Sequence, residues 1–375
     1  MNDLLLYSLA EFREVILPAL DLVGARSVVE IGGEGGTFTR ELASWAEERG
    51  AVVRCIDPSP SDALVQLADE SPAVELLRCR SLEALDGLEP ADVYLVDGDH
   101  NYFTLSRELR AITAASGGPA PVLFVHDVGW PAGRRDMYYD PGSLPPEGVH
   151  PYTYEEGVTV GCSGTVPNGF RGAGEFAWAR SEGGPDNGVL TAVEGFLAEH
   201  PELDMHIVPC VFGLAVIYAR DSAPAPGLAE LLDAYAGNPL LQRLEQNRVA
   251  LYLHVLELQG ALDGLERAVE HWQLRTRDVE VENRALWARV QELEDRVAAL
   301  SSRHAALTRE VDVVVRARSF AVAEQLSRLH SRLGQHPGIS RKRLASLLDG
   351  GPGPEISGPR PGPAPPERTT PRTGP

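Results

Sequence analysis

The stretch SVVEIGGEGGT at residues 27–37 decides the fold of this chain. It begins as an apolar run that ends near the acid Glu30, and it leads into a helical pattern that opens at Thr37. The glycines between them are Gly32, Gly33, Gly35 and Gly36. Glycine lets a backbone turn sharply and approach a ligand closely. A strand, a glycine-rich turn and a helix in this order predict the first βαβ unit of an α/β sheet.

The chain after this turn repeats the same alternation. Short apolar runs alternate with amphipathic helical stretches up to residue 126, which predicts an α/β fold with a parallel sheet. The predicted strands are Ser27–Ile31, Val52–Ile56, Val74–Leu77, Val93–Val96 and Val122–Val125.

Two later apolar runs end the sheet in another way. Met205–Val211 and Leu214–Ala219 are separated only by Phe212 and Gly213, a link too short for a crossover helix. We therefore expect the two runs to pair antiparallel and the sheet to be closed by this hairpin. A dinucleotide-binding domain of the NAD type would continue with a parallel strand instead.

The glycine turn and the end of the second strand predict a nucleoside site. A dinucleotide fingerprint needs a third glycine where this chain has Phe38. The acids Glu30 and Glu34 would repel a pyrophosphate, whereas an acid suits the positively charged sulfonium and amino group of S-adenosylmethionine (SAM). Asp57 ends the second strand, where it can accept both ribose hydroxyls. Ser81 follows the third strand, and two interpretations stay open for it: an adenine contact or a helix N-cap.

Ionisable residues gather after the fourth and fifth strands, where open α/β sheets bind ligands. They are Asp97, Asp99, His100, His126 and Asp127. One hypothesis is a divalent cation, Mg²⁺ above all, held by Asp97 and Asp127 and orienting a substrate diol. A second is a metal-free general base, His100 or His126. A third is a structural role, in which residues such as Asp99 cap the following helices.

The rest of the chain divides into four segments after a domain over residues 1–222. Residues 129–187 interrupt that domain with a Gly-, Pro- and Tyr-rich insert, which we interpret as a lid over the acceptor. Residues 223–240 are expected to be a linker helix. Leucine and valine recur in heptads over 241–316, which predicts a parallel dimeric coiled coil. A further helical segment at 317–349 and a disordered Pro/Gly-rich tail at 350–375 complete the prediction.

With these motifs in hand, the stretch from Ser27 to Ala219 resembles the Rossmann-like class I SAM-dependent methyltransferases. In detail it looks like the branch that contains macrocin O-methyltransferase and other natural-product sugar O-methyltransferases. The residues that carry the resemblance are Glu30-x-Gly32-x-x-x-Gly36, Asp57, the run VDGDHNY at residues 96–102, and Val125-His126-Asp127. The resemblance implies SAM in the glycine turn, with Asp57 on the ribose and Asp97 near the methionine end. The relatives often carry paired acids after the fifth strand, where this chain has His126 and Asp127.

The leading functional hypothesis is methyl transfer from SAM to a hydroxyl of a small molecule or sugar. His100, His126 or a metal would help to deprotonate the acceptor, and Asp127 would assist. One alternative is a coiled-coil scaffold whose SAM-binding domain has little or no activity. Another is an NAD-dependent oxidoreductase, against which the missing third glycine and the hairpin argue.

Bulk properties limit the partners and the compartment. The formal net charge of −20 argues against nucleic acid or an anionic membrane, because either would be repelled. The first 20 residues lack the basic region of a signal peptide. The four cysteines are scattered and form no CxxC pair. They predict free thiols in a reducing cytoplasm.

Overall fold

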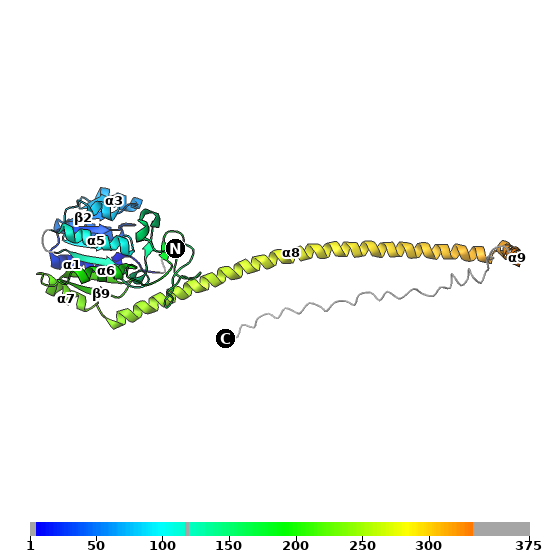
Figure 1. Ribbon diagram of the computed structural model, residues 1–375. Coiled ribbons are helices and arrows are strands. Elements are labelled where there is room, and N and C mark those ends of the chain that lie inside the picture. The colour runs from blue at the N-terminus through cyan, green and yellow to red at the C-terminus, as the bar shows by residue number, and fades with distance from the viewer. Residues whose placement is uncertain (1–4, 117–119, 333–375) are drawn as a thin grey trace, which may run out of the picture. The chain divides into compact units, whose positions relative to one another are not determined.

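A computed structural model describes residues 5–116 and 120–332 of the chain (Figure 1). The chain divides into two compact units, Met1–Ala268 and Val269–Pro375, and each is described by itself. The predicted tail at 350–375 and residues 333–349 of the predicted helical segment lie outside the described residues.

The first unit is built on one seven-stranded sheet with the order β3-β2-β1-β4-β5-β10-β9. Neighbours among the first five strands pair in parallel, whereas β10 pairs antiparallel with both β5 and β9. The predicted strands and hairpin are therefore confirmed, but the sheet stays open at β3 and β9 and is not closed by the hairpin. The strands are β1 (Ser27–Ile31), β2 (Val52–Ile56), β3 (Val74–Leu77), β4 (Val93–Val96), β5 (Val122–His126), β9 (Leu203–Val208) and β10 (Leu214–Ala219).

Helices cover both faces of this sheet because successive strand residues point to opposite faces. Val28, Val53 and Phe124 belong to one apolar cluster, and their neighbours Val29 and Leu123 belong to the other. The first cluster packs against η1 (Leu9–Phe12), α1 (Arg13–Val23), α2 (Thr37–Arg49), α3 (Asp62–Glu70) and α7 (Ala225–Asp233). The second packs against α4 (Ser81–Leu85), α5 (Tyr102–Ala115) and α6 (Val189–Glu199).

The insert at 129–187 has a small sheet of its own, with the order β6-β8-β7. The side chain of Arg135 is 2% exposed and donates to the carbonyls of Ser163, Gly164 and Ala179. The buried carboxylate of Asp136 accepts from the backbone N–H of Tyr102, which fastens the insert to α5. The elements of the insert are η2 (Ala132–Arg134), β6 (Met137–Tyr138), η3 (Pro141–Ser143), η4 (Pro146–Gly148), β7 (Tyr152–Thr153) and β8 (Ala177–Ala179).

Helix α8 runs from Pro239 to Arg316, and α9 follows at Arg318–Arg332. The first turns of α8 belong to the first unit, since Val249 is 4% and Leu253 is 7% exposed. Helix α7, within the predicted linker helix at 223–240, also belongs to the core of this unit, with Leu228 and Leu232 fully buried. The first unit thus includes the first part of α8, up to Ala268, and the domain boundary at residue 222 stays a prediction.

In the second unit the described apolar side chains of α8 face solvent. Leu286 is 63% and Leu300 is 64% exposed, so the predicted coiled coil over this stretch stays a prediction. Within the described residues, no helix combines the length and the apolar character needed to cross a membrane.

Candidate active site

The glycine turn, residues 32–36, brings the end of β1 against the end of β4. Gly32 has a φ of +89°, and a Cβ there would lie 2.2 Å from the carbonyl oxygen of Asp97. A side chain at Gly33 would meet Cys55 at 2.4 Å. Gly36, with a φ of +72°, precedes the first residue of α2. Gly35 is different, because a Cβ there would meet nothing closer than 3.9 Å.

Glu30 lies beneath this turn rather than in its opening. Its side chain accepts a hydrogen bond of 2.6 Å from the Thr39 hydroxyl on α2, and the residue is 2% exposed. Burial raises the pKa of Glu30 to about 7, more than its hydrogen bonds lower it. The carboxyl group therefore ties β1 to α2, and contact of Glu30 with a cofactor stays a prediction.

Asp57 links the end of β2 to the glycine turn. One carboxylate oxygen accepts from the backbone N–H of Glu34 and the other from that of Ser59, both at 2.8 Å. Each oxygen keeps a further lone pair for another donor. Ser81 is the first residue of α4 and contacts Glu108, while the N-cap is Arg80. The N-cap interpretation of Ser81 was wrong, and its predicted adenine contact stays a prediction.

Four side chains at the carboxyl ends of β4 and β5 form one chain of contacts, which we call the acid mouth. They are Asp97, His126, Asp127 and His100. Asp97 Oδ1 lies 2.8 Å from His126 Nδ1, which lies 3.6 Å from Asp127 Oδ2. The same Asp127 oxygen lies 3.1 Å from His100 Nδ1. Acids and imidazoles thus alternate across the mouth.

His126 has acceptors at both ring nitrogens. Nε2 lies 2.8 Å from the carbonyl oxygen of Val211, and Nδ1 faces the carboxylate of Asp97. Neither partner can donate when Asp97 is ionised, so the ring is held with both nitrogens protonated. Burial lowers the pKa of His126, but Asp97 and Asp127 outweigh it and raise the pKa to about 9. The structure therefore argues against His126 as the general base.

His100 is better arranged for that task. Its Nδ1 can donate to Asp127, which leaves Nε2 with a lone pair, and its side chain is 8% exposed. The ring of Tyr139, which is 51% exposed, packs 5.9 Å from the His100 ring. Although much of the residue is exposed, partial desolvation of its hydroxyl and the charges of Asp97 and Asp127 raise the pKa of Tyr139, so the hydroxyl stays protonated. An oriented imidazole beside a hydroxyl donor can accept a proton from a bound alcohol.

Other predicted residues lie away from this chemistry. Asp99 accepts from the Thr104 hydroxyl at the start of α5, but the N-cap of that helix is Asn101, so the expectation that Asp99 caps it was wrong. Tyr138 is fully buried and donates to Asp136, which makes it an anchor of the insert. Of the tyrosines predicted in the lid, Tyr139 is the one with a contact to the acid mouth among the described residues.

The backbone around the acid mouth is strained at three residues other than glycine. Asp127 has a φ of +59°, Val211 of +49° and Phe212 of +64°. Such conformations cost on the order of 1–3 kcal/mol each and concentrate at functional sites. Glu245 on α8 supports two of them, because its carboxylate accepts from the N–H groups of Val211 and Phe212 at 3.1 and 3.0 Å. This contribution of α8 was not predicted from the sequence.

Asp97, His126 and Asp127 are also the group that could hold a metal ion. One ligand atom from each lies within 4.8 Å of the others. The two carboxylates suit Mg²⁺, which prefers oxygen ligands. His126 does not fit, because both its nitrogens are engaged and a ligand imidazole must be unprotonated. A metal here would rest on Asp97 and Asp127.

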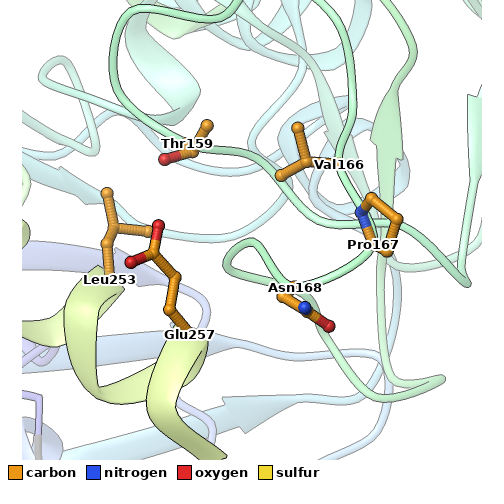
Figure 2. Close-up of a pocket in the computed structure, with 6 residues that line it drawn as sticks. All are labelled: Thr159, Val166, Pro167, Asn168, Leu253 and Glu257. Carbon is orange, nitrogen blue, oxygen red and sulfur yellow. The ribbon is translucent and has the colours of Figure 1, made fainter. Parts of the chain in front are cut away.

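A cavity of about 240 Å³ lies elsewhere, between the insert and α8. Figure 2 shows Thr159 and Asn168 of the insert across from Leu253 and Glu257 of α8. It shares no residue with the acid mouth or the glycine turn. Its walls illustrate how closely the insert approaches α8, where Phe170 also packs on Tyr252 with ring centroids 5.6 Å apart.

Comparison with known proteins now bears on these observations. Residues 29–128 match the profile of a family described as a methyltransferase domain. The matched stretch runs from β1 to just beyond β5 and so contains the glycine turn, Asp57 and the acid mouth. Among curated proteins, none matches this chain at a significant level.

Several solved structures of methyltransferases are similar in part. An O-methyltransferase of tomaymycin synthesis from Streptomyces achromogenes, in complex with SAM, is 17% identical, with 57% of this chain and 82% of that chain covered and a TM-score of 0.36. An O-methyltransferase from Bacillus cereus is 14% identical, covering 56% and 81%, with a TM-score of 0.34. A methyltransferase from Podospora anserina is 15% identical, covering 55% and 76%, with a TM-score of 0.35.

Proposed function

We propose that this protein is a SAM-dependent methyltransferase that moves a methyl group to a hydroxyl of a small molecule or sugar. The observation that carries the proposal is the match of residues 29–128 to a methyltransferase domain, because this stretch holds the glycine turn, Asp57 and the acid mouth. Two further observations support it: the close approach of the glycine turn to β4 and the dyad of His100 with Asp127.

The nucleoside would lie between the glycine turn and Asp57. The two oxygens of Asp57 each accept one backbone N–H and keep lone pairs for the two ribose hydroxyls. Gly32 lets the backbone of the turn pass close to the end of β4. Asp97 at the end of β4 would attract the amino group of the methionine part. Ser81 would line the adenine.

The acid mouth would prepare the acceptor. SAM supplies an activated methyl on a positively charged sulfur. His100 Nε2 would take the proton of the acceptor hydroxyl, and Asp127 would stabilise the resulting imidazolium at Nδ1. Doubly protonated His126 would hold Asp97 and Asp127 in place through its contacts at 2.8 and 3.6 Å. Most of the rate would come from alignment of donor and acceptor.

A metal-assisted version of the same reaction has one observation in its favour, the proximity of the Asp97 and Asp127 carboxylates. A divalent ion there would supply charge that lowers the pKa of an acceptor hydroxyl. Within this version the two carboxylates would hold the ion, and His126 would stay a hydrogen-bond donor to Val211.

The test is calorimetric titration of the full chain with SAM, with NAD⁺, and with SAM after addition of Mg²⁺ or EDTA. We expect SAM to bind saturably alone and in the presence of Mg²⁺ or EDTA, and we expect no binding of NAD⁺. A screen of hydroxyl-bearing small molecules and sugars, followed by release of S-adenosylhomocysteine, then finds the acceptor. Binding of NAD⁺ would contradict the proposal, and EDTA-sensitive turnover would favour the metal. Tight SAM binding without transfer to any acceptor would favour the scaffold hypothesis.

We also propose that a second copy of the chain covers the exposed stripe of α8. Leu265, Leu286 and Leu300 occupy d positions of the heptads and are 65%, 63% and 64% exposed. Identical stripes on two parallel helices would bury each other, and Asn283 at an a position favours two strands. Light scattering should find a dimer for the full chain and a monomer for Leu265→Glu combined with Leu286→Glu. The matched change Ala285→Glu, at a c position, should leave a dimer.

A further inference from the structure

The carbonyl that anchors His126 comes from a strained turn that the first turns of α8 hold in place. Val211 and Phe212 lie between β9 and β10, and both have left-handed backbone conformations. Valine and phenylalanine adopt this region rarely, so the turn needs outside support. Val211 is 8% and Phe212 is 5% exposed, so water cannot supply it.

Glu245 of α8 gives that support directly. Its Oε2 accepts from the Val211 N–H at 3.1 Å, and its Oε1 accepts from the Phe212 N–H at 3.0 Å. A carboxylate is the side chain that accepts two neighbouring N–H groups at once. Burial raises the pKa of Glu245, but the hydrogen bonds from Arg248 and the Phe212 N–H outweigh burial and leave the pKa below its ordinary value. The carboxyl is therefore ionised.

Arg248 fixes Glu245 from one helical turn away. Its Nε and Nη2 bond the two carboxylate oxygens at 2.7 and 2.6 Å, and its Nη1 donates to the carbonyl of Leu6 at 2.9 Å. Its guanidinium also lies 4.7 Å from the centroid of the Phe212 ring. A two-pronged pair of this kind holds both partners in one geometry. We call Glu245 and Arg248 the α8 clamp.

We propose that the α8 clamp positions His126 for the reaction, through the Val211 carbonyl that receives the Nε2–H. The sequence of contacts is continuous: Glu245 holds the Val211–Phe212 turn, Val211 holds His126, and His126 holds Asp97 and Asp127. The α8 clamp touches neither cofactor nor acceptor in this arrangement. Its residues are therefore positioning residues, and their role in turnover rests on the proposed function.

The same turn connects α8 to the insert. The Phe212 ring stacks on Phe170 of the insert, with centroids 6.0 Å apart and an angle of 7° between planes. Phe170 in turn packs on Tyr252 of α8. Loosening of the turn would thus reach both the acid mouth and the insert.

The test follows the ring N–H protons of His126 by NMR on full-length protein labelled with ¹⁵N-histidine, in the absence of SAM. His126 is assigned by the signals that disappear in His126→Gln. We expect hydrogen exchange at Nε2 to become roughly ten-fold faster in Glu245→Gln, since one of two charge-assisted acceptors is lost. Arg248→Gln should act in the same direction. The matched control is Glu257→Gln, an exposed position on the same helix.

A second readout separates positioning from mere stability. With the acceptor in hand, Glu245→Gln should lower kcat while the dissociation constant for SAM stays within about two-fold, because the nucleoside half is untouched. Unchanged exchange at His126 in both Glu245→Gln and Arg248→Gln would overturn the inference. Since the NMR measurement needs no ligand, failure of the wild-type protein to bind SAM would refute the proposed function and leave this result standing.

Discussion

The two halves of the candidate site are built in different ways. The nucleoside half, at the ends of β1 and β2, is mainly backbone: glycines, a close strand contact, and Asp57 accepting two N–H groups. The acid mouth, at the ends of β4 and β5, is a network of side chains in which two acids and two imidazoles constrain one another. The comparison teaches that the first half is fixed by local geometry and the second by partners far apart in the chain.

The largest effect is expected at His100. Replacing it by alanine removes the base and should lower turnover by roughly 10²–10⁴-fold, the usual contribution of general base catalysis. Affinity for SAM should stay nearly unchanged, because His100 belongs to the acid mouth alone. The measurement is the rate of S-adenosylhomocysteine release, with calorimetry for SAM. The control His254→Ala removes an exposed histidine of α8. Turnover within two-fold of wild type in His100→Ala would place the base elsewhere.

A second prediction separates the glycines of the nucleoside half. Gly32→Ala should destabilise the first unit by about 3 kcal/mol, because the added Cβ would collide with Asp97 in a backbone conformation that alanine disfavours. Gly35→Ala, the matched control, should cost less than about 0.5 kcal/mol, since the space there is open. Thermal unfolding followed by near-ultraviolet circular dichroism reports on the buried Trp45 and Trp178. Equal losses of stability in Gly32→Ala and Gly35→Ala would show that the close contact of Gly32 with β4 is unimportant.

The two halves also predict a common pH dependence of stability. Glu30 has a pKa raised to about 7, so it binds a proton in the folded state that it loses on unfolding between its ordinary pKa and 7. The pKa of His126 is raised to about 9, so this residue also binds a proton in the folded state that it loses on unfolding, between its ordinary pKa and 9. Stability should therefore fall as pH rises, through Glu30 first and then through His126.

The Glu30 contribution can be removed selectively. It should amount to at most about 3 kcal/mol between pH 5 and 8, and Glu30→Gln should remove this share of the fall. Glu108 contributes a second share in the same window, because burial also raises its pKa to about 7. The remaining fall above pH 7 should belong to His126. The free energy of unfolding measured by urea titration at each pH gives the profile. A stability that rises steadily from pH 5 to 8 in the wild-type protein would contradict the two causes named here, the burial of Glu30 and the carboxylates of Asp97 and Asp127 beside His126.

Much of this arrangement was readable in the sequence, for physical reasons. Strands and the glycine turn follow from local periodicity and from the conformational freedom of glycine, and all five parallel strands were found where predicted. The members of the acid mouth were also predicted, because the ends of parallel strands meet at one edge. Which nitrogen faces which acid was not predictable, since it depends on Val211 on a distant turn.

The role of α8 at the site was not predicted, because the strongest pattern of this helix, its leucine heptads, predicts pairing with a second helix. The regular leucine series leaves Leu244, Leu251 and Leu258 exposed, while Glu245 and Arg248, which lie beside these leucines on the helix, contact the turn at Val211 and the carbonyl of Leu6. One signal was present. Arg248 interrupts an a series that continues with Val255 and Leu262, and a charged residue there marks a position where the helix packs on something other than its own copy.

The smallest of the expected effects is the one that tests the nucleoside half by itself. Asp57→Ala should weaken SAM binding by roughly 10–30-fold, since two charge-assisted hydrogen bonds to the ribose are lost. Asp57→Asn should lose less, because one oxygen remains to accept. Asp62→Ala, an exposed acid at the start of α3, controls for charge alone. Because Asp57 also holds the Glu34 and Ser59 N–H groups, part of the loss in alanine comes from a looser glycine turn. The asparagine variant separates the two causes. If calorimetry finds SAM binding equally weakened in Asp57→Ala and Asp57→Asn, the loss is due to the charge of Asp57. If SAM affinity is unchanged in both variants, the ribose does not bind at this edge of the sheet.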